Sequence, residues 1–493
     1  MPPTDSDTTT ERALLAAVPT GCLIDGRWRP AARGELFTVF DPATGLPLTQ
    51  VSDAAPEDVS DALDAACRAQ PVWAATAPRQ RSELLRRAYD LLHTRREEFA
   101  LLITLEMGKP LAESRAEVAY AADYLLWFSE QAVRIAGEYR ISPQGDSRIV
   151  TMRQPVGPCL LVTPWNFPLA MMTRKAAPAF AAGCTAILKP AEDTPLTCLY
   201  FAQILVEADI PAGVVNVLPT SRPAPLVAQL LADPRLRKLS FTGSTEVGRS
   251  LAATAGARML RSSMELGGNA PFLVFEDADL QAAVEGALLA KLRNAGESCV
   301  AANRFLVHED LADAFTSQLA DRMSSLVLAR GTDPAAQMGP LINERQRARV
   351  ARLVDDAVAR GAQVVTGGGP RLDPGWFYPP TVLADVPPGA MISSQEVFGP
   401  VATVCSFKGE DEAVRLANDT EAGLVAYLYT RDINRALRVS ELLDAGMVGL
   451  NRGLVSNAAA PFGGVKQSGL GKEGGFEGLD EYLTIKYLAV DQT

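Results

Sequence analysis

Short apolar runs alternate with longer segments of helical composition between about residues 156 and 255, and this alternation constrains the fold more than any other feature. The first run, residues 158–163 (PCLLVT), stops at Pro164, as a buried strand would. Further runs are residues 185–188, 214–218 and 238–242, and the helical segments are residues 169–182, 195–209, 224–232 and 246–255. Strands and helices that alternate in this way predict a parallel sheet with crossover helices, which is an α/β domain.

A second α/β region is predicted beyond residue 270, where the alternation is less regular. Its expected strands are residues 271–275, 304–307, 402–407, 424–430 and 447–450, and its expected helices are residues 280–293, 311–329, 411–418 and 433–443. Residues 137–153 differ, because alternation around a Gln-Gly-Asp turn predicts a β-hairpin. Residues 483–490 also have strand character, and edge strands of this kind invite pairing with another subunit.

Composition excludes several classes of function. The 493 residues favour two to four domains, and 47% apolar with 21% charged residues is typical of a soluble globular protein. The net charge of −11 disfavours binding to nucleic acid or to a membrane surface. Seven widely spaced cysteines without a Cys-x-x-Cys pair, and only two histidines (His93 and His308), predict neither a disulfide framework nor a metal site. No signal-peptide pattern or bilayer-length apolar run is visible, which predicts a cytoplasmic protein.

Residues 239–248 (LSFTGSTEVG) read as a strand, a glycine-containing turn and a helix start. Backbone amides at such a helix start can bind phosphate. The stretch nearly fits a P-loop, but Arg249 stands where a lysine is required, and a Gly-x-Gly-x-x-Gly fingerprint is also missing. An NTPase is therefore disfavoured, and the turn is either structural or binds a dinucleotide in a non-standard way.

Three other segments carry residues suited to chemistry at a carbonyl group. Glu265 begins ELGGN at the end of a strand-like run, where α/β folds place groups that face a ligand. Cys299, in ESCVAANR, lies in a loop that suits an exposed thiol nucleophile, although most single cysteines are buried hydrophobes. Asn166 lies in PWNFP, where two prolines fix the backbone, so that its amide either donates to a developing oxyanion or caps a tight turn.

Seven motifs in order resemble those of the NAD(P)-dependent aldehyde dehydrogenase superfamily. They are PWNFP, Lys189-Pro190-Ala191-Glu192, FTGST, ELGGN, the cysteine in ESCVAANR, Glu396-Val397-Phe398-Gly399-Pro400 and Pro461-Phe462-Gly463-Gly464. The resemblance extends from about residue 23 to the carboxyl terminus, over 90% of the 493 residues. Within the superfamily it is strongest to succinate-semialdehyde dehydrogenases, through residues 172–175 (MTRK), LRNAGESCVAANR, Ser456-Asn457 and the terminal GLGKEGGFEGLDEYLTIKY.

The resemblance implies a role for each matching residue. Cys299 would be the nucleophile, Asn166 and the Cys299 backbone amide would hold the oxyanion, and Glu265 would activate the water that hydrolyses the thioester. The implied cofactor-binding residues are Trp165, Lys189, Glu192, Gly243, Ser244, Leu266 and Glu396. A carboxylate at Glu192 repels a 2′-phosphate, so NAD is expected to be preferred, with NADP possible.

The implied fold is α/β and aldehyde dehydrogenase-like, with two α/β domains, one for the cofactor and one for catalysis, and a small β oligomerisation element. The expected NAD-binding domain is residues 1–133 and 154–264, and the catalytic domain is residues 265–465. The oligomerisation element would be residues 134–153 and 475–493, which predicts a homodimer or a homotetramer.

The implied substrate is succinate semialdehyde, oxidised to succinate through a thiohemiacetal and a thioester on the cysteine. Arg174 and Arg293 match the carboxylate-binding arginines of succinate-semialdehyde dehydrogenases, and Ser456 matches a third contact. Paired guanidinium hydrogen bonds suit a carboxylate. Glutarate semialdehyde or another aldehyde remains the alternative. A CoA-acylating relative or a non-enzymatic one is disfavoured, because Glu265 and Cys299 are both present.

Overall fold

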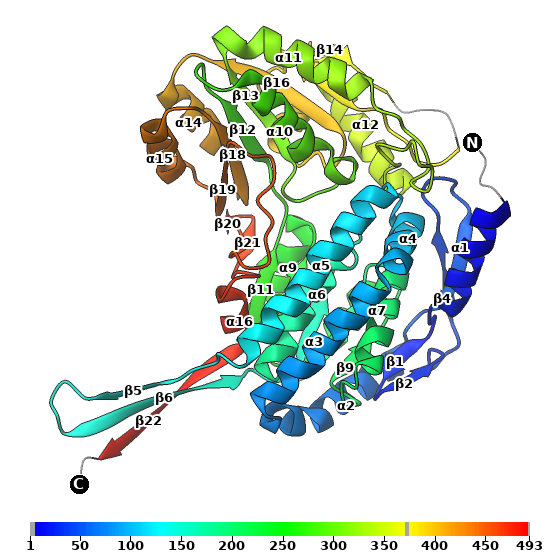
Figure 1. Cartoon of the computed structure of the whole chain (residues 1–493), viewed down its shortest axis with the longest axis vertical. Helices are drawn as coiled ribbons and strands as arrows, with labels where there is room; N and C mark the ends of the chain where they lie inside the picture. The colour runs from blue at the N-terminus through cyan, green and yellow to red at the C-terminus, as the bar shows by residue number, and fades with distance from the viewer. Residues whose placement is uncertain (1–4, 370–373, 492–493) are drawn as a thin grey trace.

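Two α/β bodies and a projecting β-arm make up the computed structural model (Figure 1). The structure describes residues 5–369 and 374–491. Residues 1–4 of the predicted NAD-binding domain, 370–373 of the predicted catalytic domain and 492–493 of the predicted oligomerisation element lie outside this range. The predicted α/β, aldehyde dehydrogenase-like fold class is confirmed, whereas the domain boundaries stay a prediction.

The first body contains an eight-stranded sheet whose central strands are parallel. In sheet order its strands are β2 (Arg27–Arg29), β1 (Cys22–Ile24), β9 (Val215–Val217), β8 (Ala186–Lys189), β7 (Cys159–Val162), β10 (Lys238–Thr242), β11 (Arg261–Glu265) and β21 (Gly469–Leu470). Its helices are α1 (Asp5–Ala17), α2 (Pro56–Ala75), α3 (Pro78–Thr94), α4 (Arg96–Met107), α5 (Leu111–Ala132), α6 (Ala170–Ala182), α7 (Pro195–Glu207), α8 (Pro223–Ala232) and α9 (Thr245–Gly256). A separate hairpin pairs β3 (Leu36–Phe40) with β4 (Pro47–Ser52).

The second body contains a seven-stranded sheet, parallel except at the β14 edge. In sheet order its strands are β14 (Gln363–Thr366), β15 (Thr381–Ala384), β16 (Val401–Phe407), β13 (Ala302–His308), β12 (Ala270–Val274), β18 (Val425–Tyr429) and β19 (Met447–Leu450). Its helices are α10 (Leu280–Leu292), η1 (Arg293–Gly296), α11 (Glu309–Ser324), α12 (Glu344–Ala359), α13 (Met391–Ser394), α14 (Glu410–Asn418) and α15 (Ile433–Leu442). A small ladder pairs β17 (Ala422–Gly423) with β20 (Val465–Lys466).

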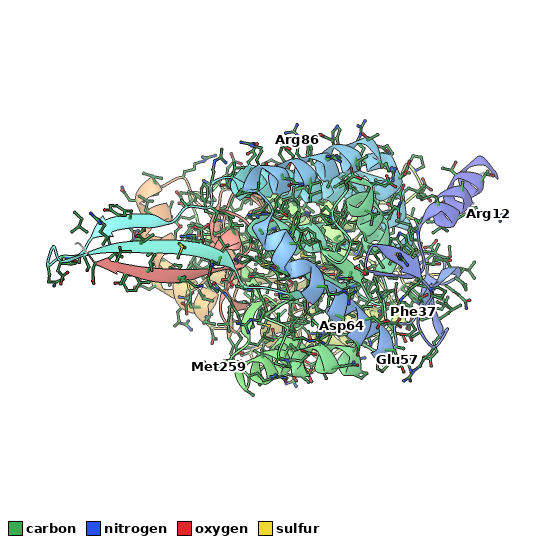
Figure 2. The ribbon with its side chains drawn as sticks, turned by 90° about the horizontal axis from the view of Figure 1, so that it is seen from below. Arg12, Phe37, Glu57, Asp64, Arg86 and Met259 are labelled. Carbon is green, nitrogen blue, oxygen red and sulfur yellow. The ribbon has the colours of Figure 1, made fainter. Side chains whose placement is uncertain are left out.

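The arm is a three-stranded antiparallel sheet that projects away from both bodies, as the view from below shows (Figure 2). The hairpin predicted at residues 137–153 forms from β5 (Glu138–Ile141) and β6 (Ser147–Pro155). The carboxyl-terminal strand β22 (Leu483–Asp491), which follows α16 (Glu477–Asp480), pairs along the other edge of β6. Tyr139, Ile141, Ile485, Tyr487 and Leu488 are large apolar side chains of the arm that are exposed.

One predicted helix is shorter than expected. The helix predicted for residues 311–329 ends at Ser324 in the structure. The backbone amides of Gln337 and Met338 both donate to the carbonyl oxygen of Val327, so the following residues join a loop contact instead of another helical turn. Composition over this stretch favours a helix, and a tertiary contact overrides that preference.

Candidate active site

The carboxyl end of β11 and the loop that precedes β13 bring the two bodies together at one place. Glu265, the last residue of β11, is 2% exposed. Just after it, a Cβ atom on Gly268 would lie 2.6 Å from the carbonyl oxygen of Cys299. Glycine is therefore needed at this position of ELGGN, because the backbone of the Cys299 loop approaches so closely. The structure thus brings the predicted base segment against the predicted nucleophile loop.

Cys299 is the accessible residue in an otherwise buried loop. Asn294 to Ser298 and Val300 are buried, whereas Cys299 is half-buried. Helix α10 ends before this loop, and Asn294 and Ala295 adopt left-handed backbone angles with φ of 57° and 52°. Conformations of this kind persist only where contacts hold them, and they gather at functional sites. Here the backbone amide of Asn294 donates to Glu113 at 2.6 Å.

Asn166 lies beside the same loop, and buried groups fix its backbone. Its carbonyl oxygen accepts hydrogen bonds from Lys109 Nζ at 2.8 Å and from Asn294 Nδ2 at 2.9 Å. Lys109 also pairs with Glu117 at 2.6 Å, and both of these side chains are fully buried. The Asn166 amide donates one N–H to the carbonyl oxygen of Glu297 at 3.1 Å. An amide group has a second N–H, so one donor remains for an oxyanion.

Glu265 is a buried carboxyl group without hydrogen-bond partners. Neither of its side-chain oxygens has one among the described residues. Burial first, and then the negative charge of Glu473, raise the pKa of Glu265 well above its ordinary value. A Cβ on Gly463 would lie 2.8 Å from Glu265 Oε1, so the glycine in PFGG gives the carboxyl group its space. A raised pKa of this kind suits a group that has to take a proton from water.

The surroundings of Cys299 favour the protonated thiol over the thiolate. Burial raises its pKa to about 12, and Glu396 and Glu265 raise it further, whereas Arg174 lowers it. The attacking species is the thiolate. Formation of the nucleophile therefore requires either a group that accepts the proton or an additional positive charge close to the sulfur.

Arg174, a predicted substrate contact, is buried and ion-paired in this structure. It is 1% exposed, and its Nε forms an ion pair with Glu473. Its guanidinium group also lies over the ring of Phe462, 4.1 Å from the centroid. Arg174 Nη2 is buried without a hydrogen-bond partner among the described residues, so one donor of this group remains unsatisfied. The role of Arg174 in substrate binding stays a prediction, now with a buried ion pair beside it.

Arg293 has a different environment. It is half-buried, and its guanidinium group lies 4.7 Å from the ring centroid of Phe167, the neighbour of Asn166. No carboxylate of the described residues forms an ion pair with it. Ser456, the third predicted substrate contact, is half-buried in the loop after β19. Arg293 is thus a cation next to the predicted oxyanion donor that is still open to an anionic ligand.

Glu396, a predicted ribose contact, is half-buried, and its carboxyl group packs against the glycines of ELGGN. Its Oε1 accepts from the backbone amide of Gly268 at 3.1 Å, and a Cβ on Gly267 would lie 2.6 Å from its Oε2. Burial raises the pKa of Glu396 to about 7. ELGGN therefore packs against two predicted functional groups, because Gly267 lies next to Glu396 and Gly268 lies next to the Cys299 loop.

The other predicted cofactor residues lie at or just beyond the carboxyl ends of β7, β8, β10 and β11. Lys189, at the end of β8, pairs with Glu192 at 3.5 Å. Ser244 caps the start of α9 by accepting from the backbone amide of Val247 at 3.4 Å, and it is exposed. Trp165 packs edge-on against Phe398, with ring centroids 5.3 Å apart.

Two glycines allow close packing at this edge of the first sheet. A Cβ on Gly243 would lie 2.5 Å from the ring of Phe241, and one on Gly248 would lie 2.2 Å from Leu266. Only glycine allows the strand, the turn and the helix start to come so close together. An exposed helix start, an acid–lysine pair and the half-buried Glu396 fit the phosphates and the two riboses of a dinucleotide.

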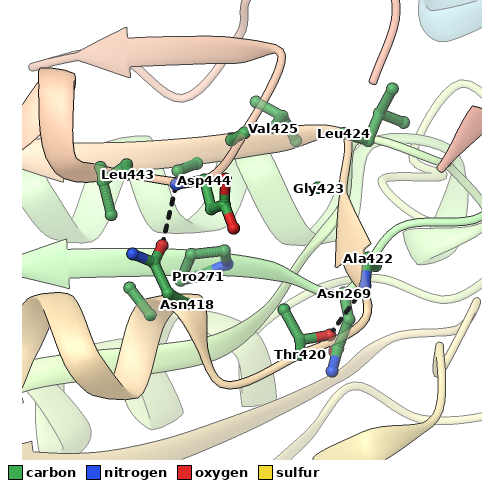
Figure 3. A pocket seen from close by; sticks show the side chains of 13 residues that line it. Asn269, Pro271, Asn418, Thr420, Ala422, Gly423, Leu424, Val425, Leu443 and Asp444 are labelled. Carbon is green, nitrogen blue, oxygen red and sulfur yellow. Dashed lines mark hydrogen bonds between the residues drawn. The ribbon is translucent and has the colours of Figure 1, made fainter. Parts of the chain in front are cut away.

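A small cavity behind ELGGN has a different character. It lies between β12, β18 and the loops that carry Asn418 and Asp444 (Figure 3). It holds about 10 Å³, which is room for roughly one water molecule.

Within the described residues no group of three His, Cys, Asp or Glu side chains could hold a metal ion. No helix in the described ranges is long and apolar enough to cross a membrane.

The sequence did not identify the buried charges that surround the site. Lys175 donates to Glu473 at 2.5 Å and to Ser240 at 3.1 Å, and all three side chains are buried. Lys175 follows Arg174 directly, and Glu473 lies in the terminal motif GLGKEGG. In the sequence, the only signal for Glu473 is an acidic residue in a glycine-rich segment. Nothing in the sequence indicates that Glu473 contacts α6.

Comparisons with known proteins agree with this geometry. The model of the aldehyde dehydrogenase family matches residues 28–488. A succinate-semialdehyde dehydrogenase of Paenarthrobacter nicotinovorans is 60% identical over 90% of this chain and 98% of its own length. A glutarate-semialdehyde dehydrogenase of Pseudomonas aeruginosa is 47% identical over 95% of this chain and 96% of its own. The crystal structure of an E. coli NADP-dependent enzyme, 46% identical, superposes with a TM-score of 0.95 over 96% of this chain and 98% of its own.

Proposed function

The chain belongs to the aldehyde dehydrogenase family, and from that premise we propose that it oxidises succinate semialdehyde to succinate with a nicotinamide dinucleotide. The substrate assignment rests on Arg293. Its guanidinium group is half-buried, has no ion-pair partner in the described structure and lies next to the segment of Asn166, the proposed oxyanion donor. A relative at 60% identity is named a succinate-semialdehyde dehydrogenase, which supports the same substrate.

The reaction begins at Cys299. Its thiolate attacks the aldehyde carbon, a C–S bond forms, and the carbonyl electron pair moves onto oxygen. The free N–H of Asn166 and the backbone amide of Cys299 stabilise this oxyanion. When bound, the nicotinamide ring supplies the hydride acceptor, so the aldehyde carbon loses two electrons and becomes a thioester. Trp165, Lys189, Glu192, Gly243, Ser244, Leu266 and Glu396 would hold the dinucleotide.

Glu265 completes the cycle. Its carboxylate takes a proton from water, and the resulting hydroxide attacks the thioester carbon. The C–S bond then breaks, the thiolate of Cys299 leaves, and a carboxylic acid is released that ionises in water. The burial of Glu265 and the lack of hydrogen-bond partners for its oxygens among the described residues support this role, because a base with a raised pKa accepts a proton more readily.

The preferred dinucleotide is NAD. Glu192 lies three residues after Lys189 and pairs with it. A carboxylate at this position would accept hydrogen bonds from ribose hydroxyls and repel a 2′-phosphate, which supports a preference for NAD. The E. coli structure is titled an NADP-dependent enzyme, so NADP remains the competing cofactor. An equal or higher kcat/KM with NADP than with NAD would contradict this part of the proposal.

The assembly and the compartment are part of the same proposal. The exposed apolar side chains on the arm support a homodimer or a homotetramer, since isolated apolar strands of this size are unusual on a monomer. Light scattering of the purified enzyme should give two or four times the chain mass. All seven cysteines are free thiols, which fits the reducing cytoplasm.

The test is a panel of succinate semialdehyde, glutarate semialdehyde and butanal, each measured with NAD and with NADP as kcat/KM. Two charge-assisted contacts should favour succinate semialdehyde over butanal by at least about 100-fold. Equal activity with butanal would contradict an acidic substrate. A higher kcat/KM with glutarate semialdehyde would make the five-carbon acid the substrate, as the relative from Pseudomonas aeruginosa suggests.

A further inference from the structure

Two tyrosines on helix α5 face the same region as the two predicted substrate arginines. Tyr120 and Tyr124 are one helical turn apart, and their hydroxyl oxygens are 2.5 Å from each other. Tyr124 is fully buried, whereas Tyr120 is half-buried. Nothing in the proposed reaction uses either of these hydroxyl groups.

Each tyrosine lies near one of the arginines. The guanidinium group of Arg293 is 6.0 Å from the ring centroid of Tyr120. The charge of Arg174 acts on the hydroxyls of both tyrosines, most strongly on that of Tyr124. Tyr124 also packs against the carboxyl-terminal motif, since a Cβ on Gly474 would lie 3.4 Å from its ring. The pair thus has the half-buried Arg293 as one neighbour and the buried Arg174 as the other.

The chemistry of the pair leaves one donor unused. Two hydroxyl groups carry two protons, and their mutual hydrogen bond uses only one of them. Burial, together with the neighbouring Tyr120, raises the pKa of Tyr124 well above its ordinary value, so this hydroxyl stays protonated. A hydroxyl that accepts from another hydroxyl is a stronger donor through its own proton. The remaining proton is therefore suited to an anionic acceptor.

We infer that the Tyr120–Tyr124 pair is a specificity-determining element that donates a hydrogen bond to the carboxylate of the substrate, beside Arg293. This inference rests on the proposed acidic substrate. The inferred contact adds a neutral hydroxyl donor to the predicted cationic donors, Arg174 and Arg293. This hydroxyl lies on α5, outside the sequence motifs that identify the family. A neutral aldehyde has no acceptor at that end, so the pair should affect acidic substrates only.

The experiment compares Tyr120→Phe and Tyr124→Phe with the wild-type enzyme, using succinate semialdehyde and butanal. Tyr120→Phe should raise KM for the acid about tenfold and leave kcat/KM for butanal unchanged. Tyr124→Phe should have a smaller effect of the same kind, because it removes only the polarising partner. Tyr200→Phe is the matched control: it removes a hydroxyl of α7 that bonds Glu98 of α4, and it should change the kinetics of neither substrate.

Product inhibition gives an independent measurement. With butanal as the reporter substrate, succinate should inhibit the wild type, and its Ki should rise about tenfold in Tyr120→Phe. If Tyr120→Phe changes acid and neutral substrates equally, or leaves the succinate Ki within twofold of wild type, the inference is wrong. If Tyr120→Phe does not fold, Tyr124→Phe decides: a rise in its succinate Ki with unchanged butanal kinetics supports the inference, and an unchanged succinate Ki overturns it. A wild-type enzyme without preference for the acid would instead overturn the proposed substrate, so the two failures are distinguishable.

Discussion

The two halves of the active site hold their functional groups in different ways. The half from the first body places Glu265, Arg174 and Lys175 in one fully buried cluster around Glu473. The half from the second body presents Cys299 and Arg293 on a loop, each half-buried and without an ion-pair partner in the described structure. The difference teaches that residues in the first half depend on one another, whereas those in the second half can be changed one at a time.

The sharpest test of this comparison is the substitution with the largest expected effect, Cys299→Ala. Loss of the nucleophile should reduce aldehyde oxidation at least about 10⁴-fold, because the residual rate then rests on binding and the oxyanion donors alone. The substitution leaves no charged side chain without its ion-pair partner, so thermal stability and NAD binding should stay near wild type. Stopped-flow NADH absorbance and dye-monitored unfolding measure the two effects. Near-normal turnover would show that another residue is the nucleophile.

Glu265→Gln is the corresponding test in the buried half. Without the base, thioester hydrolysis should slow by about 10² to 10⁴-fold, so a burst of NADH should precede a slow steady state. The pKa of Glu265 is raised, so in the wild type the carboxyl group has to lose its proton before it acts as a base. The deacylation rate should therefore increase as pH rises through that pKa, and Glu265→Gln should lack this increase. The same pH dependence of deacylation in the wild type and in Glu265→Gln would contradict the assignment.

Sequence reasoning succeeded where one local segment carries the whole signal. The alternating runs after residue 156 and the hairpin at residues 137–153 depend on local apolar patterning and turn residues, and both form as predicted. The roles of Cys299 and Glu265 came from motifs, and the structure brings their segments together through Gly268. The site roles themselves stay predictions until the variants are measured.

The ion pair of Arg174 could not be predicted from the sequence. Glu473 lies 299 residues away along the chain, and only the return of the carboxyl-terminal segment to β11 brings it to α6. Tyr120 and Tyr124 were missed for a related reason, since a tyrosine on a helix in the amino-terminal third carries no motif. Contacts between distant segments decide which buried charge meets which, and periodicity contains no information about them.

The last prediction contrasts the two arginines directly. Arg293→Leu should raise KM for succinate semialdehyde by about 10- to 150-fold, since it removes a charge-assisted contact of roughly 1.5–3 kcal/mol. Butanal kinetics and thermal stability should hardly change, because no described carboxylate loses an ion-pair partner. Arg174→Leu should instead lower the free energy of unfolding by about 3 kcal/mol, the low end for breaking a buried pair, because Lys175 still neutralises Glu473. Urea unfolding of both variants, together with kinetics on both aldehydes, measures the contrast. If Arg293→Leu destabilises the protein as much as Arg174→Leu does, or slows butanal as much as the acid, the two halves do not differ in the way their contacts indicate.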